Sequence, residues 1–213
     1  MPVNNFSVHK KDTYYNRAKK EGYRARSAYK LQEIHHRFNI FKRAFYILDI
    51  GCAPGSWLQI AKEQATKNLK KYEDQYYNRN EYKIMGIDIK HVTPIESIEI
   101  IQSNITDTDI KKKIIDYFED KIDLIISDAS IKKKGDKFTD HLNQIRLCYE
   151  ILNLTKLVLK KKGILVLKCF QGSDFKIFFD NFKKVFHITK SYKPKASKKK
   201  SNEIYLIGMK KKQ

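Results

Sequence analysis

The chain has few of the residues that mark secreted, metal-binding or membrane proteins. Its three cysteines, Cys52, Cys148 and Cys169, are odd in number, widely spaced and outside any C-x-x-C pair, so they predict neither a disulfide framework nor a cysteine metal site. His35 and His36 lack matching ligands, and we expect no metal. No apolar run approaches the roughly 20 residues of a membrane helix, and the first residues lack the apolar core of a signal peptide. We expect an intracellular protein in a reducing compartment, the cytoplasm or an organelle matrix such as the mitochondrial one, without membrane contact.

Glycine is also scarce, and the G-x-G-x-x-G fingerprint of dinucleotide-binding folds is absent. Gly51 and Gly55 lie in the stretch ILDIGCAPGSW at residues 47–57. An apolar run ends at Ile50 and helical spacing follows at residues 58–62, which predicts a strand, a tight turn and a helix. The glycines let the backbone approach a ligand, and the first N–H groups of the helix point to the same place. We expect a nucleotide-like cofactor here, although similar turns occur in βα units that bind nothing.

Negative charge is the other deficit. The 44 Lys and Arg residues outnumber 24 Asp and Glu residues, which gives a formal net charge of +20. This excess suits a polyanionic partner and favours nucleic acid. The alternative is compositional, because lysine is abundant throughout the chain and part of the excess can be solvated surface. The length of 213 residues predicts a single domain, and we expect a monomer.

Hydrophobic patterning predicts an α/β fold of three layers, with a seven-stranded, mostly parallel sheet between helices. Strands are expected at 44–50, 82–88, 98–102, 122–126, 163–169, 185–190 and 204–209. Helices are expected at 25–41, 109–118, 142–159 and 175–182. The last two strands are joined without a helical pattern, so we expect one antiparallel strand at the end. Within this domain, residues 1–24 are expected to form a basic N-terminal arm without an apolar stripe, and residues 66–81 a surface insertion.

Polar residues follow five successive strands. After the glycine turn come Asp88, Asn104, Asp128 and Lys168, each at a strand end or in the turn just after it. In open parallel sheets, ligands bind beyond these carboxyl ends. Each residue alone has an ordinary explanation, as a turn former or a solvated charge. Their convergence on one edge predicts a site.

Several longer segments resemble one family. They are Tyr14-Tyr15-x-x-Ala18-Lys19-x-Glu21-Gly22-Tyr23-Arg24-x-Arg26-Ser27-Ala28-Tyr29-Lys30-Leu31, Asp49-Ile50-Gly51-x-Ala53-Pro54-Gly55-x-Trp57, Gly86-Ile87-Asp88, Ser127-Asp128, Leu167-Lys168-x-Phe170-Gln171-Gly172, and Lys193-Pro194-x-x-Ser197 running to Glu203-x-Tyr205. With these segments the chain resembles the FtsJ-like (RrmJ-like) S-adenosylmethionine-dependent RNA 2'-O-ribose methyltransferases from about residue 12 to residue 210. The resemblance implies a Rossmann-like methyltransferase fold with S-adenosylmethionine as cofactor.

The resemblance also implies roles for individual residues. It implies a catalytic tetrad of Lys30, Asp128, Lys168 and Glu203. The residues that it implies for binding of the methyl donor are Gly51, Gly55, Trp57, Asp88, Asn104, Ile105 and Asp128. Core packing of Trp57 and a solvated counter-charge at Glu203 are the alternatives. The chain departs from the family in two places, with Asn104 where an aspartate is common and Ala129-Ser130-Ile131 in place of Met-Ala-Pro.

Methyl transfer to a ribose hydroxyl requires removal of the hydroxyl proton. A lysine amine accepts a proton only when it is neutral, and burial beside apolar residues favours the neutral form. The hypothesis is that Lys168 accepts the proton, with the other three tetrad residues orienting it and the ribose.

Three basic segments, Lys10–Arg26, Lys132–Lys137 and Lys193–Lys200, are expected to contact RNA phosphates, and Tyr14, Tyr15 or Tyr23 to stack on exposed bases. Ribosomal RNA, possibly within a ribosomal subunit, is the expected substrate. The alternatives are the anticodon loop of tRNA, a catalytically inert RNA-binding assembly factor, and a small-molecule O-methyltransferase.

Overall fold

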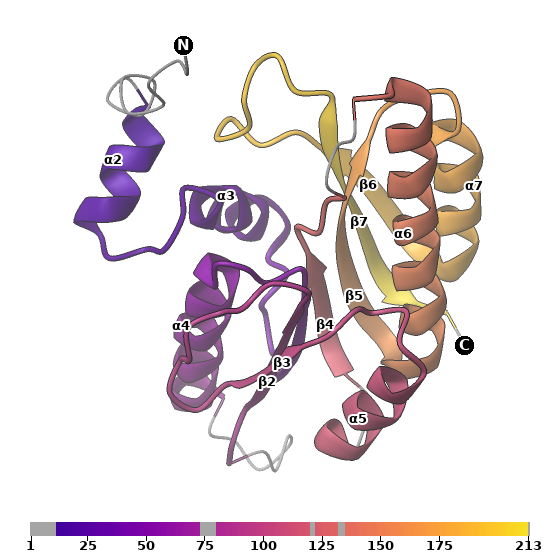
Figure 1. Cartoon of the computed structure of the whole chain (residues 1–213). Helices are drawn as coiled ribbons and strands as arrows, with labels where there is room; N and C mark the ends of the chain where they lie inside the picture. The colour runs from indigo at the N-terminus through magenta and orange to yellow at the C-terminus, as the bar shows by residue number, and fades with distance from the viewer. Residues whose placement is uncertain (1–11, 73–79, 120–121, 132–134, 213) are drawn as a thin grey trace.

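A computed structural model describes residues 12–72, 80–119, 122–131 and 135–212. The framework is one seven-stranded sheet with the strand order β3-β2-β1-β4-β5-β7-β6 (Figure 1). The strands are β1 (Tyr46–Ile50), β2 (Lys83–Asp88), β3 (Glu99–Gln102), β4 (Ile122–Ser127), β5 (Leu159–Phe170), β6 (Phe186–Tyr192) and β7 (Glu203–Lys211). Strand β7 runs antiparallel to both β5 and β6, and the other pairs are parallel. This confirms the expected mostly parallel sheet with one antiparallel strand.

The parallel register brings the strand ends together. Ile50 pairs with Ile87 on one side and with Ser127 on the other, so the turns after β1, β2 and β4 leave the sheet at the same edge. Polar residues that follow these strands therefore meet there, although they are far apart in the sequence.

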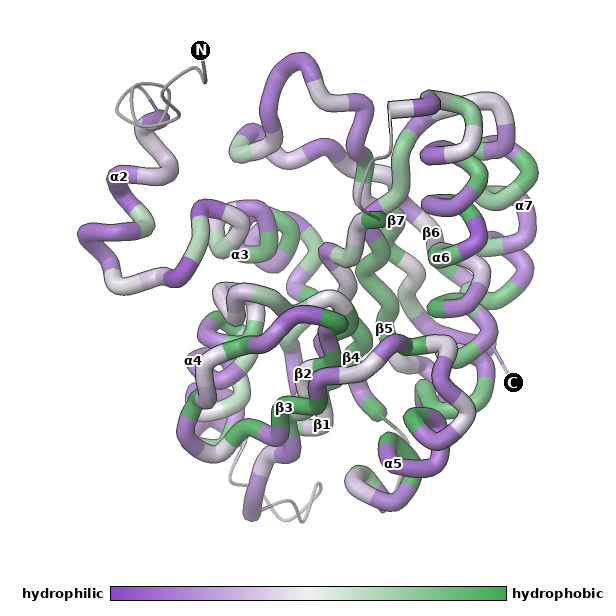
Figure 2. Tube along the Cα trace, in the orientation of Figure 1, coloured by the Kyte–Doolittle hydropathy of each residue, from purple (hydrophilic) through white to green (hydrophobic). Residues whose placement is uncertain are grey.

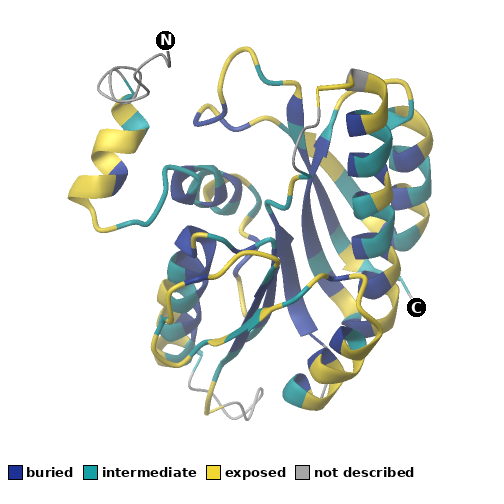
Figure 3. Ribbon diagram, viewed as in Figure 1, coloured by how far each residue is buried: buried dark blue, intermediate teal, exposed yellow. Residues whose placement is uncertain are grey.

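Helices cover both faces of the sheet. They are α2 (Thr13–Lys20), α3 (Ala28–Phe38), α4 (Ser56–Lys71), α5 (Thr108–Phe118), α6 (Lys137–Val158) and α7 (Phe175–Val185). The apolar residues of α3 and α4 pack with one face of the strands, and those of α5, α6 and α7 with the other. Figures 2 and 3 show the result, with apolar, buried strands at the centre and polar, exposed outer helix surfaces. Within the described parts of the chain, no helix has the length and apolar character needed to cross a lipid bilayer.

The surface insertion expected at residues 66–81 was placed too early. Helix α4 continues to Lys71, and Ala65 and Asn68 bury one side of its last turns. The side-chain amide of Asn68 donates hydrogen bonds to the carbonyls of Phe41 and Ala44, at 2.7 and 2.9 Å. These bonds fasten the end of the helix to the segment before β1. The remainder of the expected insertion, residues 73–79, lies outside the described residues.

The expected basic arm also contains ordered structure. Helix α2 begins after Asp12, whose carboxylate accepts a hydrogen bond from the N–H of Tyr15. Asp12 also forms an ion pair with Arg26, and Ala18 packs against Tyr29 and Ala196. Ala18, with Tyr14 packed beside it, gives α2 too short an apolar surface to form a stripe in the sequence. Residues 1–11 lie outside the described residues.

Candidate active site

The turn after β1 has a backbone that only glycine adopts easily. Gly51 has a φ of +77°, and its N–H donates to the carbonyl of Ile87 at 2.7 Å. A Cβ at this position would lie 2.6 Å from the Cα of Ala129, in the turn after β4. Gly51 therefore lets the turns after β1, β2 and β4 approach one another.

Asp88 joins the same turns through its carboxylate. One oxygen accepts from the N–H of Ala53 at 2.9 Å and the other from the N–H of Lys90 at 2.8 Å. Each oxygen keeps a second lone pair for a ligand hydroxyl. Asp88 is thus placed to hold the turn and to accept a hydrogen bond from a ligand.

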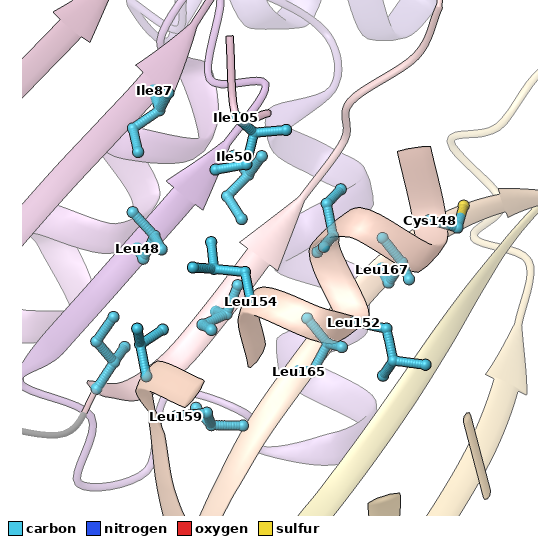
Figure 4. Packing of buried hydrophobic residues seen from close by; sticks show 14 of the residues in the cluster. Leu48, Ile50, Ile87, Ile105, Cys148, Leu152, Leu154, Leu159, Leu165 and Leu167 are labelled. Carbon is cyan, nitrogen blue, oxygen red and sulfur yellow. The ribbon is translucent and has the colours of Figure 1, made fainter. Parts of the chain in front are cut away.

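A cavity of about 560 Å³ opens between these turns and α6. Ile50, Ile87 and Ile105 form an apolar wall (Figure 4), and Asp88, Asn104 and Asp128 contribute polar groups. The volume lies in the usual range for small-molecule sites, and an apolar wall with few polar groups suits a nucleoside. Asn104 is exposed at the cavity edge, where its Oδ1 accepts from the N–H of Thr106 at 3.1 Å.

The structure brings five of the seven expected donor-binding residues to this cavity: Gly51, Asp88, Asn104, Ile105 and Asp128. Gly55 and Trp57 do not line it. Trp57 is buried in the core, where its indole N–H donates to the carbonyl of Ser27 at 2.8 Å and its ring packs on Tyr205.

Gly55, with a φ of +108°, faces a different neighbour. The guanidinium of Arg24 lies behind it, 2.7 Å from the position of a Cβ. Arg24 donates to the carbonyls of Pro54, Thr93 and Pro94, at 3.2, 2.6 and 3.0 Å. Arg24 thereby ties the glycine turn to the loop after β2. Gly55 leaves the space that Arg24 occupies, and this contact is visible only in the three-dimensional structure.

The four expected tetrad residues lie in two ion pairs at the same edge of the sheet. The Nζ atom of Lys168 lies 3.1 Å from Oδ1 of Asp128 and donates to the Asp128 carbonyl at 2.7 Å. Nζ of Lys30 lies 2.6 Å from Oε1 of Glu203. Both lysine side chains are largely buried, with exposed fractions of 9% and 12%.

Tyr205 connects the two pairs. The antiparallel register of β5 and β7 places Tyr205 opposite Lys168. Its hydroxyl donates to Oδ1 of Asp128 at 2.6 Å, and Nζ of Lys30 lies 5.7 Å from its ring centre. Burial, together with the charges of Asp128 and Glu203, raises the pKa of Tyr205 well above its ordinary value, so the hydroxyl stays protonated and donates. The sequence motif contained Tyr205, but nothing in it indicated this role.

Two buried carboxyl groups have pKa values that are shifted in opposite directions. Burial by itself would raise the pKa of Glu203, but Lys30, Ser197 and Lys168 outweigh it and lower the pKa. Glu203 is therefore a carboxylate at neutral pH. Asp49, next to the last residue of β1, is fully buried, and its oxygens have no hydrogen-bond partner among the described residues. Burial and the charges of Asp128 and Asp88 raise the pKa of Asp49.

Comparison with known proteins adds an independent view. The family model described as FtsJ-like methyltransferase matches residues 23–211. The protein named ribosomal RNA large subunit methyltransferase E of Methanococcoides burtonii is 39% identical over 202 residues, covering 94% of this chain and 70% of that protein. The protein of the same name from Nitrosopumilus maritimus is 38% identical over 198 residues, covering 93% of this chain and 94% of that protein.

Solved structures are similar as well. A Plasmodium falciparum protein described as a ribosomal RNA methyltransferase is 31% identical, with a TM-score of 0.74 over 89% of this chain and 98% of that chain. A Streptococcus mutans protein described as a methyltransferase in complex with SAH is 12% identical, with a TM-score of 0.50 over 85% of this chain and 97% of that chain. This second similarity concerns the fold alone.

Proposed function

The chain belongs to the FtsJ-like methyltransferase family and is an S-adenosylmethionine-dependent methyltransferase of RNA, and from this premise we propose that it methylates a ribose 2'-hydroxyl of large-subunit ribosomal RNA. The observation that carries the proposal is the pair of lysine–carboxylate contacts, Lys168 with Asp128 and Lys30 with Glu203, beside a cavity that fits a nucleoside. Ribosomal RNA is proposed because the relatives named above carry it in their names. The acceptor strand is proposed to approach the sheet edge where these two pairs lie.

The donor is proposed to bind in the cavity. Ile50, Ile87 and Ile105 would contact the adenine ring, Asp88 would accept from a ribose hydroxyl, and Asn104 would contact the adenine edge. The glycine turn would approach the donor through Gly51 and Ala53, and Trp57 would support this turn from the core. When bound, S-adenosylmethionine supplies a methyl group on a positively charged sulfur, and the acceptor oxygen displaces that sulfur in line.

Lys168 is proposed to take the proton of the acceptor hydroxyl. Asp128 orients the Lys168 amine with two oxygens, its backbone carbonyl and one carboxylate oxygen. The remaining bonding position of Nζ therefore points in one direction. Tyr205 donates to one of these oxygens, which fixes the carboxylate beside the amine. A neutral amine is the form that accepts a proton. The second ion pair, Lys30 with Glu203, would orient the acceptor ribose.

Exposed basic residues near this edge are proposed to bind RNA phosphates. They include Arg17, Lys19 and Lys20 on α2 and the lysines at 193–200. Of the three tyrosines expected to stack on bases, Tyr15 is exposed, whereas Tyr14 and Tyr23 pack against Tyr29. The basic segment 132–137 lies partly outside the described residues.

Labelled methyl transfer tests the proposal. Purified protein is incubated with labelled S-adenosylmethionine and, separately, with large-subunit ribosomal RNA, whole ribosomal subunits and tRNA, and the label is mapped to the nucleotide and to the ribose or base. We expect label on a ribose of large-subunit RNA and none with Lys168→Ala, which should still bind the donor. Label on tRNA or on a base would contradict the substrate or the acceptor that we propose.

A further inference from the structure

The connection between β6 and β7, residues 193–202, leaves the sheet and reaches toward α3 (Figure 1). We refer to it as the lysine-rich connection. It contains no helix or strand, and its exposed lysines are Lys193, Lys195, Lys198, Lys199 and Lys200. Its middle is nevertheless buried, with Ala196 fully covered and Ser197 6% exposed. An irregular, highly charged segment with a buried centre must be held by specific contacts.

One carboxylate provides several of these contacts. Both oxygens of Glu33, on α3, accept from the backbone N–H of Lys195 at 2.9 Å, and Oε2 also accepts from the N–H of Ala196 at 3.4 Å. The hydroxyl of Tyr192, at the end of β6, donates to Oε1. On the other side of the segment, Arg26 donates to the carbonyl of Ala196. Hydrogen bonds to a charged acceptor are stronger than neutral ones, so Glu33 is the main anchor.

The same helix also reaches the end of the connection. Lys30 lies three residues before Glu33, on a neighbouring position of the helix surface, and forms the ion pair with Glu203. Ser197, directly after the anchored residues, is close enough to lower the pKa of Glu203. Helix α3 therefore fixes the beginning of the connection through Glu33 and its end through Lys30.

We infer that Glu33 is a positioning residue for the RNA substrate: it holds the lysine-rich connection on α3, which sets the exposed lysines toward phosphates and keeps Glu203 opposite Lys30. The inference rests on the proposed function, because it takes RNA as the ligand of these lysines. Simple electrostatics predicts the opposite effect for loss of Glu33. Removal of a carboxylate makes a chain of charge +20 more positive, which by itself strengthens RNA binding.

The test compares Glu33→Ala, Glu33→Gln and Glu119→Ala. Glu119 follows α5 on the surface, where it pairs with Lys83, and its removal changes the charge equally. Affinity for a transcript of large-subunit ribosomal RNA is measured over a range of salt concentrations, together with donor affinity, kcat and KM. With Glu33→Ala we expect RNA affinity to fall about tenfold, the effect of losing charge-assisted hydrogen bonds, while donor affinity is unchanged.

Further readouts separate positioning from general stability. The salt dependence of RNA binding should become shallower with Glu33→Ala, because fewer lysines reach phosphates, and KM for RNA should rise more than kcat falls. Glu33→Gln should lie between, since its amide oxygen still accepts from one backbone N–H, and Glu119→Ala should bind RNA at least as well as the wild type. RNA affinity of Glu33→Ala equal to that of Glu119→Ala would overturn the inference. So would loss of donor affinity in parallel with RNA affinity for both Glu33 variants. If the wild type methylates no RNA, the proposed function fails, while the binding measurements still decide the role of Glu33.

Discussion

Lys168 directs its amine at two oxygens of a single residue, Asp128, the backbone carbonyl at 2.7 Å and the carboxylate at 3.1 Å. The carbonyl belongs to the turn after β4 and is fixed by the sheet, whereas the carboxylate is shared with the hydroxyl of Tyr205. The amine is therefore oriented by the backbone as well as by a side chain. This arrangement distinguishes an oriented lysine from a merely charged one.

Lys168→Arg should abolish most activity although it preserves the positive charge. Arginine is not deprotonated in proteins and cannot accept the hydroxyl proton. We expect kcat to fall by at least about 10²-fold, the usual contribution of a general base, with donor affinity retained. Single-turnover methyl transfer and equilibrium donor binding measure the two quantities. Near-normal kcat in this variant would mean that Lys168 acts through its charge alone.

Tyr205→Phe should affect both stability and catalysis. The substitution keeps the ring against Trp57 but removes the hydrogen bond to Asp128 inside the protein, which should lower the free energy of unfolding by about 1–3 kcal/mol. Without the hydroxyl, the Asp128 carboxylate loses a donor that fixes it beside Lys168, and kcat should fall.

Tyr117→Phe is the matched control, because its hydroxyl donates to the carbonyl of Ile84 at 3.2 Å on a different part of the sheet. Denaturant unfolding and kcat should show a stability loss in both variants and a catalytic loss in Tyr205→Phe alone. An equal loss of kcat in the control would assign the effect to stability.

Gly51→Ala should disrupt the donor cavity. The added Cβ would overlap the backbone of Ala129, and the positive φ is strained for alanine. We expect donor affinity to fall by more than about tenfold and stability by about 2 kcal/mol or more. Gly135→Ala has the same kind of strain, at a φ of +103°, but meets no atom within 4 Å. Calorimetric donor binding should therefore be normal in that control, and weakened binding in both variants would point to backbone strain as the cause.

Acid should remove the contribution of Glu203 to stability. The pKa of Glu203 is lowered in the folded protein, so this side chain binds fewer protons in the folded state than in the unfolded state. The stabilisation is therefore fully present above the ordinary pKa of a glutamate. It is lost as the pH falls through the folded-state pKa. The difference in free energy of unfolding between the wild type and Glu203→Gln should be constant near neutral pH and shrink on acidification. A difference that grows in acid would contradict the assigned direction.

Charge reversal on α2 should weaken RNA binding in a salt-dependent way. Lys19 and Lys20 are both exposed. For Lys19→Glu with Lys20→Glu, the slope of log affinity against log salt should fall by about 0.7–0.9 for each lost phosphate contact. Reversal of Lys112 and Lys113, also exposed but on α5, makes the same change of charge and should have a smaller effect. Filter binding at several salt concentrations distinguishes a direct contact of Lys19 and Lys20 with RNA from the general attraction between RNA and a positively charged protein.

The ends of β2 and β4 were predictable from the sequence because each apolar run stops at a polar residue. The parallel register of a buried sheet then brings Asp88 and Asp128 together without further information. Contacts that depend on pairing between distant strands were not predictable. Tyr205 acquires its partner only through the antiparallel register of β5 and β7, and the buried indole N–H of Trp57 finds its acceptor in the carbonyl of Ser27. The end of α4 was missed because Asn68, a polar residue, is buried by hydrogen bonds to backbone carbonyls.

The place of β7 between β5 and β6 has a consequence for biosynthesis. This strand carries Glu203 and Tyr205, and both of its neighbours precede it in the chain. A nascent polypeptide that has emerged as far as β6 contains the residues that line the cavity and the Lys168–Asp128 pair. It lacks Glu203, the partner of Lys30. The contacts of Glu203 with Lys30 and of Tyr205 with Asp128 can therefore form only once β7 lies between β5 and β6.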